Sequence, residues 1–146
     1  MPFDAPIRPK VRQRLHLRMA TPDDGEAIGR LVVNAGWTLP GIEWADLGAN
    51  WLVAEYDGAL VGCLEVLFGK PLGRVELLGI DPNLSPRVKA MIVKALIGQG
   101  CAVLERFGSQ VACGIVGNDL PEYQRVIQKR GGQIVLRNAS CFARYL

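Results

Sequence analysis

Long hydrophobic runs, histidine and paired cysteines are scarce in this sequence. No apolar segment approaches the roughly 20 residues of a membrane-spanning helix. The four cysteines stand far apart, form no C-x-x-C pair and are expected to be reduced small hydrophobes: Cys63, Cys101, Cys113 and Cys141. The single histidine, His16, lies in an alternating run that turns it toward solvent. These scarcities argue against a membrane protein, a metal centre and a histidine-dependent catalytic triad.

The length and composition indicate one soluble globular domain. The chain has 146 residues, of which 49% are hydrophobic and 21% are charged. A chain of this length can bury a core without disulfides or a structural metal. Its first residues, Met1-Pro2-Phe3-Asp4, lack the charged and apolar regions of a secretory signal. The expected compartment is therefore the cytoplasm.

Charge is concentrated at one end of the sequence. The net charge is +3, and residues 1–14 set several basic side chains against the single acid Asp4: Arg8, Lys10, Arg12 and Arg14. The rest of the chain is balanced, which argues against a nucleic-acid surface on the folded body. We expect residues 1–14 to form an extended, proline-containing basic arm and residues 15–146 to form a single domain.

Hydrophobic periodicity and turn signals predict a succession of strands and helices. Asp57-Gly58 is a tight-turn pair between two runs of strand formers, and Ser85-Pro86 is typical of a helix start. The expected order is strand 15–20, helix 21–36, loop 37–50, strands 51–56, 59–68 and 74–80, helix 85–107, strand 111–116, helix 118–131, and strands 133–136 and 140–145. The three central strands have short connections and are expected to form an antiparallel meander.

Periodicity also predicts which side chains share a face. In the helix over 85–107, one face is expected to be buried against the sheet: Val88, Met91, Ile92, Ala95 and Leu96. Gly98 and Gly100 each cost about 1 kcal/mol relative to alanine, so a kink or a break there is left open. In the strand over 74–80, alternation predicts a common face for four residues: Arg74, Glu76, Leu78 and Ile80.

This order of elements resembles the GNAT acyltransferase superfamily over residues 15–146. The family's Leu-x-Val-x-Pro strand end appears as Leu78-Gly79-Ile80-Asp81-Pro82, its hairpin turn as Asp57-Gly58, and the asparagine that opens its fourth helix as Asn118. The resemblance implies an α/β (α+β) fold with a mixed, mostly antiparallel sheet flanked by helices. It also implies that acetyl-coenzyme A (acetyl-CoA) binds where the fourth and fifth strands splay apart. Backbone groups of one strand end would then bind the pantetheine arm: Leu78, Gly79 and Ile80.

The family's glycine-rich pyrophosphate loop is altered in this chain. The aligned residues are Ser85, Pro86, Arg87, Val88, Lys89 and Ala90, of which only the last keeps the pattern. Pro86 removes an amide donor, Val88 adds a branched side chain, and Ser85 can cap amides that a phosphate would otherwise occupy. Arg87 and Lys89 can compensate with charge. A phosphate site and a plainly capped helix therefore both stay open.

The family's general acid is also displaced. In the family, a tyrosine on the fourth helix protonates the leaving thiolate and stands four residues before a glycine. Aligning on Gly131 puts Ile127 at that position. Tyr123, one helical turn earlier, is the candidate acid if the helix is shifted, and a tyrosine at the edge of the core is the alternative.

Acylation of an amine also needs a base, because the attacking amine is mostly protonated at neutral pH. Glu76 is the candidate base. Glu65 on the preceding strand is expected to pair across from it, which would raise the pKa of one of the two carboxyls. A solvated strand glutamate is the alternative. Trp37 and Trp44 are expected to form an aromatic wall where the acceptor enters.

The resemblance implies direct transfer of an acetyl group from acetyl-CoA, as co-substrate and without a metal, to a primary amine on a small molecule or a protein. The alternative is a non-catalytic GNAT-fold structural or interaction module, because the chain is also similar to small GNAT-like proteins of short-tailed phages. A homodimer or virion partners are left open, with the virion as the compartment under the alternative. Acylation of nucleic acid has only the basic arm in its favour.

Overall fold

The computed structural model describes residues 15–37, 39, 41–44, 50–115, 121–129 and 131. Along the chain, the elements are β1 (Leu15–Met19), the 3-10 turn η1 (Pro22–Asp24), α1 (Gly25–Asn34), β2 (Trp51–Tyr56), β3 (Ala59–Leu67), β4 (Leu72–Ile80), α2 (Pro86–Arg106), β5 (Val111–Cys113) and α3 (Pro121–Lys129). The arm expected over 1–14, the strands expected over 133–136 and 140–145, Asn118 and Cys141 lie outside the described residues.

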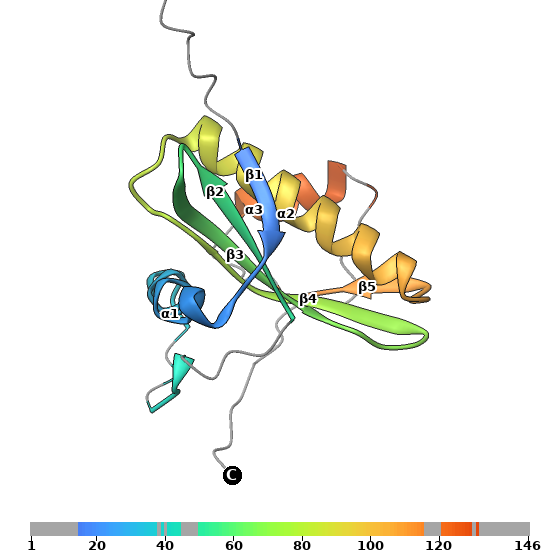
Figure 1. The fold of residues 1–146 in the computed structure, drawn as a ribbon. Helices are drawn as coiled ribbons and strands as arrows, with labels where there is room; N and C mark the ends of the chain where they lie inside the picture. The colour runs from blue at the N-terminus through green and yellow to red at the C-terminus, as the bar shows by residue number, and fades with distance from the viewer. Residues whose placement is uncertain are drawn as a thin grey trace, which may run out of the picture.

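The five strands form one sheet in the order β1-β2-β3-β4-β5. Neighbouring strands from β1 to β4 are antiparallel, and β5 lies parallel to β4. α1 packs on one face of the sheet against β3 and β4, and α2 packs on the other face with α3 beside it (Figure 1). This arrangement confirms the mixed, mostly antiparallel sheet flanked by helices. Within the described ranges, no helix is long and apolar enough to cross a bilayer.

The β2–β3 hairpin sets the register of the sheet. Asp57 and Gly58 both have positive φ, 53° and 78°, as a tight two-residue turn between antiparallel strands requires. The pairing that follows places Trp51 opposite Glu65, and Val53 opposite Cys63. The hairpin predicted from Asp57-Gly58 is confirmed.

A β-bulge interrupts β4 at Leu77. Glu76 pairs with Glu65 and Gly79 pairs with Cys63, so β4 has one more residue than β3 between these two pairs. Leu77 has a φ of 51°, in the left-handed region that a bulky side chain rarely adopts. The extra residue changes which side chains face each helix along the rest of the strand.

The expected common face of β4 is therefore wrong beyond Glu76. Val75 packs with the α2 side of the core, so its neighbours Arg74 and Glu76 point to the α1 side. Leu78 and Ile80, by contrast, both pack with the α2 side. A regular two-residue alternation would have kept all four on one face, and the bulge shifts that alternation by one residue.

The buried face of α2 is rotated from the predicted one. Ile92 and Leu96 are fully buried as expected, but Met91 is 40% exposed, and the predicted place of Met91 in the core is wrong. The helix instead turns Val93 and Leu104 inward. The face that contacts the sheet is therefore rotated by about one residue from the predicted apolar face. Val88 and Ala95 are half-buried.

α2 runs unbroken through both glycines, and Gly100 is needed for close packing. A Cβ at Gly100 would lie 2.9 Å from Leu64 Cδ2 and 3.0 Å from Val75 Cγ1. The absent side chain thus lets the helix approach β3 and β4 closely. The kink that Gly98 and Gly100 left open does not occur within the continuous helix.

α1 covers a second apolar cluster on the opposite face. Ile28 and Val32 are fully buried in it, and Leu31 is nearly so, whereas Ala35, at the end of the predicted stripe, is exposed. The backbone of α1 lies close to β4, because a Cβ at Gly79 would be 2.8 Å from the Leu31 carbonyl carbon. This cluster and the one beneath α2 sandwich the sheet.

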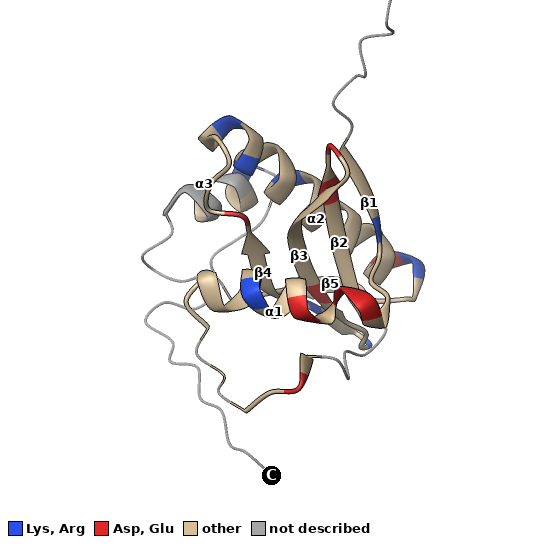
Figure 2. Ribbon diagram, turned by 60° about the vertical axis from the view of Figure 1, so that its left-hand side comes forward, with Lys and Arg blue, Asp and Glu red and all other residues tan. Residues whose placement is uncertain are grey.

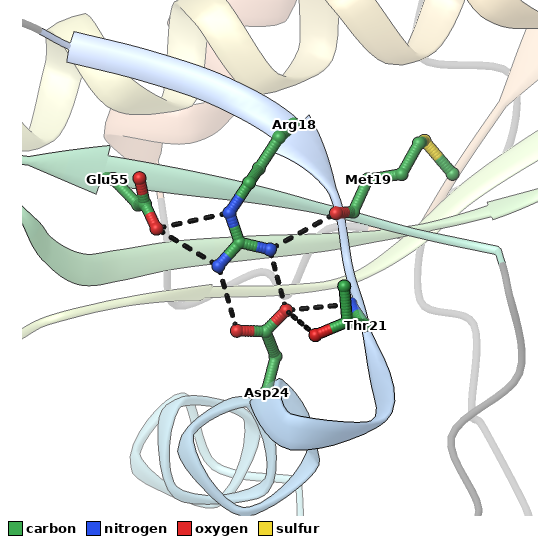
Figure 3. A network of polar contacts seen from close by, with 5 residues as sticks. All are labelled: Arg18, Met19, Thr21, Asp24 and Glu55. Atoms are coloured by element: carbon green, nitrogen blue, oxygen red, sulfur yellow. Dashed lines mark hydrogen bonds and ion pairs between the residues drawn. The ribbon is translucent and has the colours of Figure 1, made fainter.

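An arginine ties β1, η1 and β2 together (Figure 3). The Arg18 guanidinium donates to both oxygens of Asp24, at 2.7 and 2.9 Å, and to Glu55 Oε1 at 3.0 and 3.1 Å. Asp24 also accepts from the Thr21 backbone N–H at 2.7 Å, which caps the helical turn. These bonds hold the pKa of Asp24 down to about 2, with Arg18 as the main cause.

Candidate active site

Within the described ranges, one edge of β4 is paired only at its beginning. β5 pairs with three β4 residues, of which Arg74 is the last. A Cβ at Gly114 would collide with the Val75 carbonyl oxygen, so the chain after β5 still touches β4 at that point. From Glu76 to Ile80, β4 pairs on one side only, with β3, within the described ranges. Among the described residues, the backbone groups along this half of β4 have no second strand partner, as binding of an extended ligand requires.

The predicted pantetheine-binding residues lie on this open half. Gly79 and Ile80 pair with β3 on one side, opposite Cys63 and Gly62. Their side-chain positions are occupied by contacts with the helices, because Gly79 lies against α1 and Ile80 packs into the core beneath α2. An extended ligand on the free side would thus meet the backbone of β4, as the resemblance implies.

The start of α2 follows directly from this strand end. Ser85 is its cap, and Ser85 Oγ accepts a hydrogen bond from the Val88 backbone N–H at 3.3 Å. The Lys89 N–H donates to the Ser85 carbonyl oxygen at 3.0 Å. Pro86 has no N–H, so among the described residues the Arg87 N–H is the first-turn amide left for an anion. The capped-helix alternative is thus realised in this geometry.

The side chains of this turn leave room for an anion all the same. Val88 packs inward on the core beneath α2, so its branched side chain does not cover the helix terminus. Arg87 and Ala90 are exposed and Lys89 is half-buried. Figure 2 shows basic residues over the first turns of α2, so the helix dipole and these side chains both favour negative charge.

Two carboxyls face each other beside the open edge. Glu65 on β3 and Glu76 on β4 are direct register partners, which confirms the predicted cross-strand pair. Both point to the α1 side of the sheet, where Glu65 is half-buried and the Glu76 side chain is 19% exposed. Burial raises the pKa of Glu65, and the Glu76 charge raises it further, whereas Arg74 opposes the rise.

Arg74 belongs to this site, although no catalytic or binding role was predicted for it. Its Nη1 lies 3.5 Å from Glu76 Oε1, and its side chain is 57% exposed. Alternation along the strand predicted that Arg74 and Glu76 share a face, and this part of the prediction is confirmed. The Leu77 bulge, in contrast, has no signal in the sequence, because a leucine with positive φ cannot be recognised from its neighbours.

The position of the predicted general acid cannot be read from the described residues. Tyr123 lies within α3, but its side chain is outside the described residues, as is Asn118. Ile127, the residue at the family's tyrosine position, is half-buried. The roles of Tyr123 and Asn118 stay predictions.

The two tryptophans expected beside the acceptor pack around α1. Trp44 meets Trp51 edge to face, with ring centroids 6.1 Å apart, and a Cβ at Gly29 would overlap its ring. Trp37 joins the same cluster. Trp44 also lines a hollow of about 680 Å³ on the outer side of α1, whose lining includes no residue of β3 or β4. Trp51 is the register partner of Glu65, so the aromatic cluster adjoins the carboxyl pair from the β2 side.

The described cysteines are free thiols, and the histidine lies at the surface. Cys63, Cys101 and Cys113 are free thiols, and burial raises the pKa of Cys63 to about 12, which keeps it protonated. His16 is exposed on β1, as expected. Among the residues that the structure describes, no three His, Cys, Asp or Glu side chains are grouped to hold a metal ion.

Solved structures of acetyltransferases share this architecture. Rv2747 from Mycobacterium tuberculosis, in complex with CoA, superposes with a TM-score of 0.67 at 19% identity, covering 86% of this chain and 76% of its own. Ard1 from Thermoplasma volcanium gives 0.68 at 18% identity, covering 84% of each chain. Aminoglycoside N-acetyltransferase AAC(6')-Iy, in complex with CoA, gives 0.66 at 18% identity, covering 91% of this chain and 95% of its own.

No protein-family model and no curated protein matches the sequence. The similar structures lend no support to the expected likeness to phage proteins. At 18–19% identity, the likeness concerns the fold. The strand order, the half-paired β4 edge and the superpositions together show that the chain has the fold of the GNAT acetyltransferases.

Proposed function

We propose that this chain is an N-acetyltransferase that moves an acetyl group from acetyl-CoA directly to a primary amine. The observation that carries the proposal is the open edge of β4 beside the Glu65–Glu76 pair. An extended ligand on that edge would end close to two carboxyls, one of which has a raised pKa. The CoA bound to structures of the same fold supports this choice of co-substrate.

In this proposal, Leu78, Gly79 and Ile80 bind the pantetheine arm through their backbone groups, as an added strand would be bound. Glu76, together with Glu65 opposite it, is the general base that takes a proton from the attacking ammonium. The amine then attacks the thioester carbonyl, the new C–N bond replaces the C–S bond, and the thiolate leaves. Tyr123 is the proposed donor of the proton that the thiolate takes up, and Asn118 is proposed to contact the coenzyme.

The pyrophosphate is proposed to lie at the start of α2. Arg87, Lys89 and the Arg87 N–H would supply charge and a hydrogen bond there, with Ala90 leaving space. The Ser85 hydroxyl bonds the Val88 N–H at 3.3 Å, a long bond, and a phosphate oxygen could replace it as acceptor. The acceptor amine belongs to a small molecule or a protein.

Isothermal titration of acetyl-CoA tests this site. We expect micromolar binding and a raised melting temperature, because a ligand that binds only the folded state stabilises it. Arg87→Glu with Lys89→Glu should abolish binding and leave the fold intact, since both side chains lie at the surface of the helix start. Lys94→Glu, an exposed residue two turns further along α2, is the matched control. Neither heat nor a thermal shift with millimolar acetyl-CoA would refute the enzyme proposal.

Turnover is tested separately, with a panel of primary amines. The panel contains an aminoglycoside, a small aliphatic diamine and a peptide with a free N-terminus, and release of the CoA thiol is measured. We expect release with at least one amine, above the rate without acceptor.

The second candidate function is a non-catalytic module of the same fold. The Ser85 cap and the missing N–H of Pro86 favour it, because both reduce the donors that a pyrophosphate would meet. On this account, acetyl-CoA neither binds nor stabilises the protein. The titration described above therefore decides between the two functions.

A further inference from the structure

Glu65 is a half-buried carboxyl whose side chain has no hydrogen bond or ion pair within the described part of the chain. Its register partner on β4 is a second carboxyl, Glu76. Directly opposite residues on antiparallel strands have Cβ atoms about 5 Å apart, and like charges there destabilise the pair. Two ionised carboxylates are thus disfavoured at this position.

Arg74 acts on the two carboxyls unequally. Its Nη1 lies 3.5 Å from Glu76 Oε1, so it forms an ion pair with Glu76 and none with Glu65. The charge of Glu65 is less compensated by the guanidinium, so Glu65 has the greater tendency to hold a proton.

We propose that Glu65 and Glu76 act as one proton-accepting pair, in which Arg74 forms an ion pair with Glu76 and Glu65 carries the proton taken from the acceptor amine. This inference rests on the proposed acetyl transfer. Arg74 is a positioning residue, since it acts through Glu76. Two interacting carboxyls of this kind titrate as a pair, in two steps.

The proton balance is simple. The acceptor enters as an ammonium beside the ionised pair, gives one proton to the pair, and leaves the amine with a lone pair for attack. When the C–N bond has formed and the C–S bond has broken, the thiolate takes a proton from Tyr123, and the second proton of the nitrogen replaces it on Tyr123. The proton on Glu65 then returns to water, and the pair is ionised again.

Among the residues that the structure describes, few other charges lie on the elements around Glu65. From β2, its opposite residue is the uncharged Trp51. From α1, Glu26 and Arg30 pair with each other at 3.0 Å and are largely exposed. From β4, Glu76 raises and Arg74 lowers the pKa of Glu65. Variants of these two residues should therefore shift the pH dependence in opposite directions.

The test is the pH profile of acetyl transfer to an amine of the panel. Glu65→Gln should lower kcat about 100-fold while the affinity for acetyl-CoA stays unchanged. Glu76→Gln should move the acid limb of the remaining activity to lower pH, because a negative neighbour of Glu65 is lost. Arg74→Gln should move the limb to higher pH. The matched control, Glu105→Gln on the exposed side of α2, should change nothing.

A second measurement needs no acceptor. Carboxyl-carbon NMR titration should show Glu65 titrating above the range of an ordinary glutamate, and at lower pH in Glu76→Gln. The inference is overturned if Glu65→Gln remains fully active, if both limbs move the same way, or if Glu65 titrates identically in all variants. No transfer by the unmodified protein with any amine would instead refute the proposed function, and this inference with it.

Discussion

Arg18 and Asp24 show how single side chains position elements of this fold. Asp24 is 9% exposed and bound by both Arg18 and Thr21, so its charge is held where β1 meets η1. The pKa of Asp24 falls from 3.8 to about 2 on folding. Because the folded value is the lower one, the ionised group stabilises the fold above about pH 4, and this contribution is lost as the pH falls toward 2.

We therefore expect Asp24→Asn to lower the free energy of unfolding by about 2 kcal/mol near pH 7 and to flatten its decline below pH 4. Chemical denaturation at a series of pH values measures both effects. The neighbour Asp23 supplies the control, because its side chain is exposed and Asp23→Asn should change the free energy of unfolding near pH 7 very little. Equal slopes for the unmodified protein and Asp24→Asn would contradict the assigned role of the carboxylate.

At the scale of elements, α2 offers a direct comparison of buried and exposed positions. Leu96 is fully buried and Met91 is 40% exposed on the same helix. Leu96→Ala should cost about 2 to 5 kcal/mol, because it removes buried methyl groups and leaves a cavity. Met91→Ala should cost much less, near the range of surface substitutions, about 0.5 kcal/mol. Comparable losses in urea denaturation would show that the helix is turned differently.

The basic segment over residues 1–14 is the second element to test. Its prolines and charged side chains supply little to a core, so its deletion should leave the melting temperature nearly unchanged. Differential scanning calorimetry of the shortened chain measures this. A drop of many degrees would mean that the segment packs on the domain.

At the scale of the whole molecule, the features of the fold that could be predicted are those that depend on local sequence signals. The β2–β3 hairpin follows from Asp57-Gly58, and the short connection between β3 and β4 already suggested that Glu65 lies across from Glu76. The orientation of α2 could not be predicted as well, because Met91 and Val93 are both apolar and only the shape of the sheet selects between them. The bulge at Leu77 was missed for a similar reason. Tertiary contacts hold its backbone at positive φ, and a leucine in the sequence gives no sign of that conformation.

The extra residue at Leu77 shifts the alternation of β4 side chains between the two faces of the sheet by one position. Before it, β4 turns Arg74 and Glu76 to one side of the sheet; after it, the same strand places Leu78 and Ile80 under the opposite helix. One continuous strand can thus serve a charged site with its first half and anchor a hydrophobic core with its second. If that single residue were removed, regular alternation could not place the charged side chains and the later apolar side chains on the sides where they now lie. The charged site and the core of this protein therefore depend on the same inserted residue.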